Sequence, residues 1–163
     1  MRIEDATDAD VPEIVAIYND VIATSTAVFS ERPVTVADRR EWLRARQAQA
    51  YPVIVARMDG AVAGFASYGA FRSGSGYQRT VEHSVHVAAA RRRQGIGLRL
   101  LEELLDRARR EGRHVVVAGV DADNRASLRL HEQLGFEQVG RMPQVARKFD
   151  RWVDLSLLQI TLS

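Results

Sequence analysis

The sequence predicts one α/β domain in which helices cover both faces of a mixed sheet. A chain of 163 residues, 46% of them apolar, fits a single domain with its own hydrophobic core. Short segments with strand patterning alternate with segments whose apolar residues recur at helical spacing. Strand-turn-strand segments fill the first half of the chain and strand-helix-strand segments fill the second, a mixture typical of α/β sheets. Because no repeat or long linker divides the sequence, residues 1–163 are expected to form one domain.

The first half of the chain is expected to contain two helices and four strands. Thr7 and Thr35 begin T-D-A-D and T-V-A-D, which resemble capping boxes with Asp in place of the usual Glu, and a helix is expected after each. Asp59-Gly60 is a strong hairpin signal between two strand-like runs. The expected strands are Arg2–Asp5, Tyr51–Met58, Ala61–Phe71 and, after a loop at 72–78 rich in Ser and Gly, Thr80–Val87.

The second half is expected to contain two helices and three strands. The segment after Gly95 places its apolar residues on one helical stripe, and Gly112 is suited to end that helix. A shorter helix is expected over Ser127–Leu134, ended by Gly135. The expected strands are Val115–Val120, Phe136–Gly140 and Val153–Leu162.

Composition excludes several classes of protein. The net charge is only +2 although the pI is about 9.4, and all but one of the 23 basic residues are arginines. This favours local sites for planar anions over a polyanion-binding surface, so no nucleic-acid partner is expected. The absence of cysteine excludes disulfides and thiolate chemistry. No apolar run approaches the roughly 20 residues that span a membrane, and the acidic N-terminus is unlike a signal peptide, so a cytoplasmic protein without membrane contact is expected.

The segment A-R-R-R-Q-G-I-G, Ala90 to Gly97, fits the pattern R-x-x-G-x-G between a predicted strand and a predicted helix. Glycines let a phosphate approach the backbone, and the free N–H groups of the first helical turn then point at the anion. The alternative is a glycine-containing helix start with solvated arginines. The segment is not a Walker loop, because no Gly-Lys-Ser/Thr follows, and its position in the middle of the fold argues against a dinucleotide fingerprint.

A second polar motif follows about thirty residues later. Asn124, Ser127 and His131 are spaced i, i+3, i+7 and are expected to share one helix face. A polar line of this kind is a candidate site, although an exposed polar face is the commoner origin of such a pattern.

The two motifs in this order resemble those of the GNAT superfamily of acyl-CoA-dependent N-acetyltransferases. The superfamily carries a Q/R-x-x-G-x-G/A loop, then N-x-x-A/S-x-x-x-Y-x-x-x-G-F. The chain matches the second motif in N-R-A-S-L-R-L-H-E-Q-L-G-F except that His131 replaces the tyrosine. The phosphinothricin and methionine sulfoximine acetyltransferases carry a histidine at that position, and the chain resembles them there. The resemblance extends along the chain through the segments I-A-T-S-T-A-V-F, Y-P-V-I-V-A, D-G-A-V-A-G and T-V-E-H-S-V-H-V.

The resemblance implies an acetyl-CoA site on a mixed, mostly antiparallel sheet. The strand segment Val85, His86 and Val87 would pair its backbone with the pantetheine arm and polarise the thioester carbonyl. Asn124 and Ser127 would hold the cosubstrate near its reacting end. The pyrophosphate would be bound by the loop and first helical turn, which comprise Arg92, Arg93, Gln94, Gly95, Ile96, Gly97 and Leu98.

Glu82 is the candidate general base. Acetylation of an amine needs the neutral amine, and a carboxylate can take its proton. Glu82 is expected to face opposite to Val81 and His83 on its strand, and family members carry the same Glu in V-E-x-x-V. The alternative is an ion pair with one of the many arginines.

His131 is the second catalytic candidate. A neutral imidazole can relay the proton of the amine, or an imidazolium can protonate the departing thiolate; a structural histidine is the alternative. His83 and His86 are interpreted as packing or surface groups. The histidines lack metal-ligand spacing, so no metal is expected.

The acceptor is expected to be a small amino acid analogue of the methionine sulfoximine, methionine sulfone or phosphinothricin type. An arginine can bind its carboxylate through two hydrogen bonds, and aromatic rings can enclose its side chain. Another amine or a protein N-terminus is the alternative acceptor. The resemblance also implies a homodimer. Besides Glu82, the candidate acceptor contacts are Phe29, Arg72, Ser75, Gly76, Tyr77 and Arg79.

Overall fold

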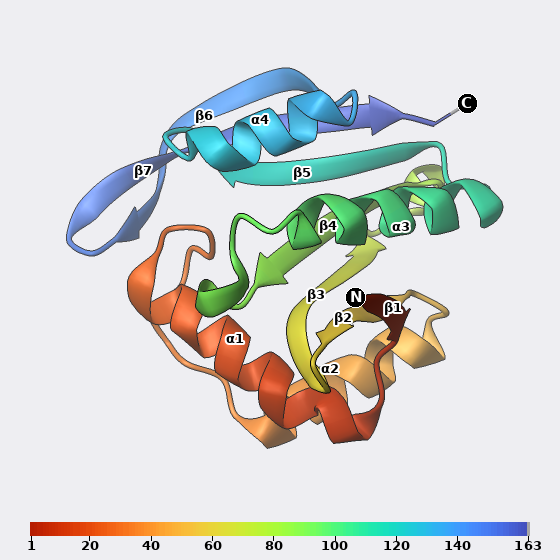
Figure 1. The fold of residues 1–163 in the computed structure, drawn as a ribbon. Coiled ribbons are helices and arrows are strands. Elements are labelled where there is room, and N and C mark those ends of the chain that lie inside the picture. Colours follow the sequence, from red (N-terminus) through yellow and green to blue (C-terminus); the bar gives the residue numbers. More distant parts are fainter. Residues whose placement is uncertain (163) are drawn as a thin grey trace.

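The computed structural model describes residues 1–162, which form one seven-stranded sheet with four α-helices (Figure 1). The strand order is β1-β2-β3-β4-β5-β7-β6. The helices are α1 (Val11–Thr24), α2 (Val36–Ala48), α3 (Ile96–Arg110) and α4 (Arg125–Gln133). The strands are β1 (Arg2–Asp5), β2 (Val53–Met58), β3 (Ala61–Ala70), β4 (Thr80–Val87), β5 (Val115–Asp121), β6 (Glu137–Lys148) and β7 (Arg151–Thr161).

The sheet is antiparallel except between β4 and β5, which confirms the predicted mixed architecture. The parallel ladder is short: it runs only from Thr80 opposite Val115 to Glu82 opposite Val117. Beyond that point β4 turns away from β5 (Figure 1). The backbone of the second half of β4 therefore has no strand partner on its β5 side.

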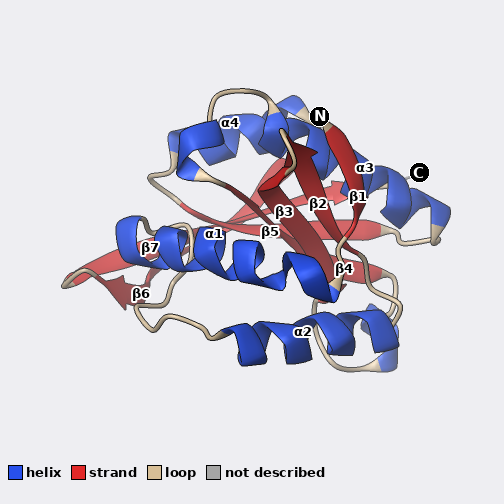
Figure 2. Cartoon of the chain, turned by 60° about the horizontal axis from the view of Figure 1, so that its bottom comes forward, coloured by secondary structure: helices blue, strands red, loops and turns tan. Residues whose placement is uncertain are grey.

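Two helices cover each face of the sheet (Figure 2). One core cluster lies between α3 and the sheet and includes Leu100, Leu104 and Val81. The other lies between α1, α2 and the sheet and includes Ile14, Leu43 and Phe65. Because side chains alternate along a strand, Val81 and Glu82 face opposite helix pairs, and Glu82 faces the side of α1 and α2.

The predicted capping boxes form at both early helices. The Thr35 hydroxyl accepts from the Asp38 N–H at 3.1 Å, and the Asp38 carboxylate accepts from the Thr35 N–H at 3.0 Å. At Thr7 the backbone N–H donates to Asp10 at 2.9 Å. A short 3-10 turn precedes α1 there, so the regular helix begins at Val11. Aspartate can thus replace glutamate at the third position of the box.

Two predicted boundaries need correction. The strand expected over Phe136–Gly140 extends to Lys148 as β6, with register shifts between Gln138 and Gly140 and between Met142 and Ala146 that interrupt its side-chain alternation. The helix expected from Ser127 begins at Arg125. The other strands lie within two residues of their predicted ends.

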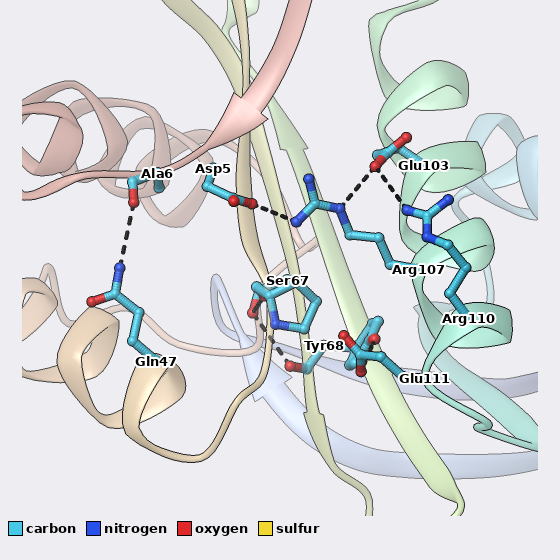
Figure 3. A network of polar contacts seen from close by, with 10 residues as sticks. Asp5, Ala6, Gln47, Ser67, Tyr68, Glu103, Arg107, Arg110 and Glu111 are labelled. Atoms are coloured by element: carbon cyan, nitrogen blue, oxygen red, sulfur yellow. Dashed lines mark hydrogen bonds and ion pairs between the residues drawn. The ribbon is translucent and has the colours of Figure 1, made fainter.

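A polar network ties α3 to the rest of the domain (Figure 3). Arg107 donates to Asp5 of β1 and, at 2.8 Å, to Glu103 one turn earlier. The hydroxyl of buried Tyr68 donates to Glu111 at 2.6 Å. These contacts and the apolar stripe hold α3 against the sheet, which fixes the position of its N-terminus. Within residues 1–162 no helix is long and apolar enough to cross a membrane.

Candidate active site

The unpaired edge of β4 forms the first part of the candidate site. Val85, His86 and Val87 pair with Ala66, Phe65 and Gly64 of β3 on one side only. Their backbone groups on the other side face the region where β5 has turned away. An extended ligand can add to such an edge as a strand would, through main-chain hydrogen bonds.

The N-terminus of α3 begins beside this edge and has the geometry of an anion site. Arg93 and Gly95 both adopt left-handed conformations, with φ of 61° and 77°. The first helical hydrogen bond is donated by the Arg99 N–H to the Gly95 carbonyl at 3.1 Å, so the N–H groups of the preceding turn have no partner within the helix. Alternating backbone of this kind turns successive N–H groups toward one point. The segment predicted to bind pyrophosphate therefore fits a phosphate.

The three arginines before Gly95 have different environments. Arg91 forms an ion pair with Asp59 at 2.9 Å instead of standing free in solvent. Arg92 and Arg93 are exposed. A Cβ at Gly97 would lie 3.6 Å from Val87 and 3.7 Å from Leu130, so this glycine lies where β4, α3 and α4 meet.

Asn124 serves as the cap of α4. Its Oδ1 accepts from the Ser127 N–H at 3.1 Å. The expectation that Asn124 and Ser127 share a helix face with His131 is therefore wrong for Asn124, because an asparagine at this position caps the helix more favourably than it extends it. The amide Nδ2 of Asn124 has no hydrogen-bond partner within residues 1–162 and can donate to a ligand.

Glu82 faces the side of α1 and α2, as its strand position predicts. The Glu82 side chain is exposed, but the atoms packed around it partly desolvate the carboxyl group and raise its pKa, while the nearby charges of Arg72 and Arg46 oppose that rise. Glycines flank it on both neighbouring strands: Gly69 lies opposite on β3, and a Cβ at Gly119 of β5 would lie 3.9 Å from Glu82 Oε2. Neither glycine position is empty, because the Arg46 guanidinium lies over Gly69 and Leu155 packs 3.3 Å from a Cβ at Gly119.

His131 is buried and makes hydrogen bonds through both ring nitrogens. Nδ1 lies 2.6 Å from the Ser127 carbonyl oxygen, so Nδ1 carries the proton and donates it. Nε2 lies 2.9 Å from Nε2 of His83 and must accept from it. Burial lowers the pKa of His131, and burial with the neighbouring His131 lowers that of His83 to about 3. Both imidazoles are therefore neutral at physiological pH.

His83 and His86 are packing residues, as predicted, although His83 also contacts a candidate catalytic group. His86 is buried on the opposite face, 5.5 Å from the Tyr18 ring and 5.3 Å from the Phe65 ring. Burial lowers its pKa to about 4, so only its backbone is available to a ligand. Among residues 1–162 no group of three or more metal-ligating side chains is found.

The loop candidates form an exposed rim next to Glu82. Arg72, Ser75, Gly76, Tyr77 and Arg79 are all exposed. The rings of Tyr77 and Phe71 lie 5.9 Å apart, and the Arg72 guanidinium lies 4.9 Å from the Phe71 ring. Only Arg72 of this set is coupled to Glu82 through its charge.

A cavity of about 430 Å³ opens between the segment after α1 and the end of β5. Its walls include Thr26, buried Asp121 and Phe149, and the Thr26 hydroxyl donates to Asp121. Phe29, predicted from the same segment, is half-buried and does not line it. Buried Lys148 fixes this wall, since its ammonium donates to the Ser25 and Val28 carbonyls at 2.6 and 2.7 Å.

Sequence reasoning missed the positions of Arg46 and Lys148 and the contact of His83 with His131. Arg46 had a detectable signal: with Arg39, Trp42 and Leu43 it occupies the i, i+3, i+4, i+7 positions of one helix face, where arginine is unexpected. For His83 and Lys148 the sequence offers no comparable signal, because their partners lie far away along the chain.

Comparisons with known proteins agree with this geometry. Residues 14–136 match the model of the acetyltransferase (GNAT) family. An L-methionine sulfoximine/L-methionine sulfone acetyltransferase of Pseudomonas paraeruginosa is 49% identical over 98% of this chain and 94% of that protein.

Two solved structures have the same fold with a TM-score of 0.98. A ribosomal-protein-alanine N-acetyltransferase from Brucella melitensis is 44% identical, covering 99% of this chain and 100% of that one. The acetyltransferase yncA from Salmonella typhimurium, solved with its cofactor acetyl-CoA, is 45% identical, covering 100% of this chain and 94% of that one.

Proposed function

The chain belongs to the acetyltransferase (GNAT) family, and on that premise we propose that it acetylates the α-amino group of a small amino acid analogue. The acceptors proposed are methionine sulfoximine, methionine sulfone and phosphinothricin. The amine of the acceptor attacks the thioester of acetyl-CoA directly, while both substrates are bound. The observation that carries the proposal is the position of Glu82, which is the last residue of β4 paired to β5, at the start of the unpaired edge.

Acetyl-CoA, which supplies the acetyl group as a thioester, is proposed to lie along that edge. The backbone of Val85 to Val87 would bind the pantetheine arm, and the turn from Arg92 to Leu98 would bind the pyrophosphate. Arg92 and Arg93 add positive charge beside these N–H groups. Asn124 Nδ2 and the Ser127 hydroxyl would contact the cosubstrate near its reacting end.

Glu82 is proposed to take the proton from the acceptor ammonium. A carboxyl group with a raised pKa holds a proton more readily than an ordinary glutamate does, which suits a base working near neutral pH. Its carboxylate forms no ion pair within the described residues, so it is free to receive the proton of the amine.

His131 is proposed as a second proton-handling group. Its neutral ring supports proton relay and disfavours an imidazolium stored for the departing thiolate. A proton reaching the ring must be accepted at Nε2, in place of the hydrogen bond from His83.

The acceptor is proposed to bind on the face of α1 and α2, between Phe29 and the exposed loop. Arg72 has the charge and position to approach a carboxylate near Glu82. Ser75, Gly76, Tyr77 and Arg79 would close over the acceptor from the same loop.

A homodimer is also proposed, supported by the apolar surface of β6 and β7. Four large apolar side chains are exposed there: Val139 at 56%, Met142 at 45%, Val145 at 45% and Trp152 at 56%. Large apolar side chains exposed on neighbouring strands favour association. Light scattering of the purified protein should give twice the monomer mass, and Trp152→Glu should reduce that mass.

The proposed activity is tested with an acceptor panel. Purified protein is incubated with acetyl-CoA and individual amino acids, analogues and an alanine-terminated peptide, and released thiol is followed. Methionine sulfone and methionine sulfoximine should give the fastest release. No release with any amino acid would reject the proposal. Faster release with the peptide would favour the alternative acceptor, a protein N-terminus. The name of the Brucella melitensis relative, a ribosomal-protein-alanine N-acetyltransferase, motivates this alternative.

A further inference from the structure

Arg46 of α2 lies against the sheet directly beside the proposed base. Its guanidinium occupies the space above Gly69, where an added Cβ would overlap Nη1 and lie 2.6 Å from Cζ. Gly69 is the residue of β3 that faces Glu82 across the ladder. Arg46 and Glu82 therefore lie side by side on the same face of the sheet, on the face of α1 and α2.

The guanidinium of Arg46 does not find hydrogen-bond partners for all of its donors in the protein. Among residues 1–162 its buried Nη1 has no hydrogen-bond partner. Its one aromatic contact is distant, with Cζ 5.6 Å from the Trp42 ring. A buried donor without a partner costs free energy, so an unpaired N–H of a guanidinium needs an explanation. Structural packing alone does not supply one, because a methionine would fill the same space above Gly69 without an unpaired donor.

Glu82, the neighbouring carboxylate, also lacks a side-chain partner. Within the described residues it forms no hydrogen bond and no ion pair with Arg46 or any other side chain, although the two groups are coupled through their charges. Residues opposite each other on neighbouring strands are roughly 5 Å apart. An α-amino acid carries an ammonium and a carboxylate on one carbon, so it can place one group at each of these sites.

We propose that Arg46 binds the carboxylate of the amino acid acceptor while Glu82 receives the proton of its amine. The inference rests on the proposed function and adds a specificity-determining residue to it. Arg72 lies on the exposed loop, whereas Arg46 is half-buried and its guanidinium lies over Gly69, next to Glu82. An N-terminal residue of a protein has an amide where the acceptor has its carboxylate, so this arrangement selects free amino acids over peptides.

The test compares L-methionine sulfone with its carboxamide as acceptors for two variants. Arg46→Gln removes the positive charge. Gly69→Ala keeps the charge but displaces the guanidinium, because the new methyl group would occupy its place. Arg40→Gln is the matched control for the first, since Arg40 is exposed on the same helix. Gly140→Ala is the control for the second, because a Cβ there makes only ordinary contacts of 3.9 Å and beyond.

In both variants the KM for methionine sulfone should rise about 10- to 100-fold, the range for one charged hydrogen bond. The KM for the carboxamide should change little, and so should the affinity for acetyl-CoA and the melting temperature. Both controls should match the wild type. If the wild type acetylates amino acids and both variants keep its KM for methionine sulfone, Arg46 is not a carboxylate site although the proposed function stands. If the wild type acetylates no amino acid, the function and this inference both fail.

Discussion

Glu82 lies directly opposite Gly69 across the ladder between β3 and β4. The missing side chain at Gly69 leaves space that Arg46 fills, so the proposed base has a positive charge on that side. This relationship leads to specific expectations for catalysis.

Glu82→Gln should lower kcat by about 10² to 10⁴, the usual contribution of a positioned general base. The affinity for acetyl-CoA, measured by calorimetry, should remain unchanged, because the side chain points to the opposite face from α3. Glu102→Gln on the exposed side of α3 is the control and should keep full activity. Wild-type kcat in Glu82→Gln would show that this carboxylate is not the base.

The pH dependence of kcat at saturating acceptor should report the carboxyl group of Glu82. Its pKa is raised by partial desolvation, so activity should fall on acidification at a higher pH than a glutamate with an ordinary pKa would give. Arg46 and Arg72 both lower this pKa, so Arg46→Gln and Arg72→Gln should each move the acidic limb to higher pH. A limb that stays in place in both variants would contradict this assignment, while Arg40→Gln should leave it in place.

Gly95→Ala should weaken acetyl-CoA binding at least tenfold in a titration. A φ of 77° is strained for alanine, and relief of that strain would turn the N–H groups of the turn away from the phosphate. Gly112→Ala is a matched control, because Gly112 has a φ of 73° and, like Gly95, nothing within 4 Å of an added Cβ. Equal losses of acetyl-CoA affinity in both variants would point to general destabilisation.

The ring of His83 should remain neutral between pH 5 and 8, and His131 should titrate below its ordinary value of 6.5. Burial lowers the pKa of both, so ¹⁵N NMR should show Nδ1 protonated in neutral His131 and no titration of His83 in this range. Because the unfolded chain binds protons near pH 6.5 and the folded pair does not, stability should be complete above that pH and decrease as the pH falls below it. A midpoint near 6.5 for His131 in the folded protein would contradict this.

Lys148→Met should destabilise the domain by about 1–3 kcal/mol, since it removes the donor for the Ser25 and Val28 carbonyls. The wall that contains Thr26 should loosen, which raises the KM for the acceptor more than that for acetyl-CoA. Urea unfolding and steady-state kinetics measure the two effects. Arg147→Met, at the neighbouring exposed position, should show neither the loss of stability nor the rise in KM. Equal losses of stability in both variants would mean that any substitution in this part of β6 destabilises the domain.

Local signals in the sequence were sufficient for much of the fold. The boxes at Thr7 and Thr35, the turn at Asp59-Gly60 and the stripe of α3 each depend on residues close in the chain, and all form as predicted. The length of β6 was missed because two register shifts break its alternation.

Only part of the candidate site could be predicted from local sequence signals. The direction of Glu82 follows from strand alternation alone. The contact between His83 and His131 joins residues on β4 and α4, and the position of Arg46 depends on a glycine of another strand. Such contacts arise from tertiary packing, which the order of residues does not reveal.

The central claim is tested most directly by internal competition. Wild-type protein and limiting acetyl-CoA are mixed with equal concentrations of L-methionine sulfone, its carboxamide and an alanine-terminated peptide, and the acetylated products are quantified by mass spectrometry. The account predicts N-acetyl methionine sulfone as the dominant product. Acetylated peptide as the dominant product, or no acetylated amino acid at all, would contradict it.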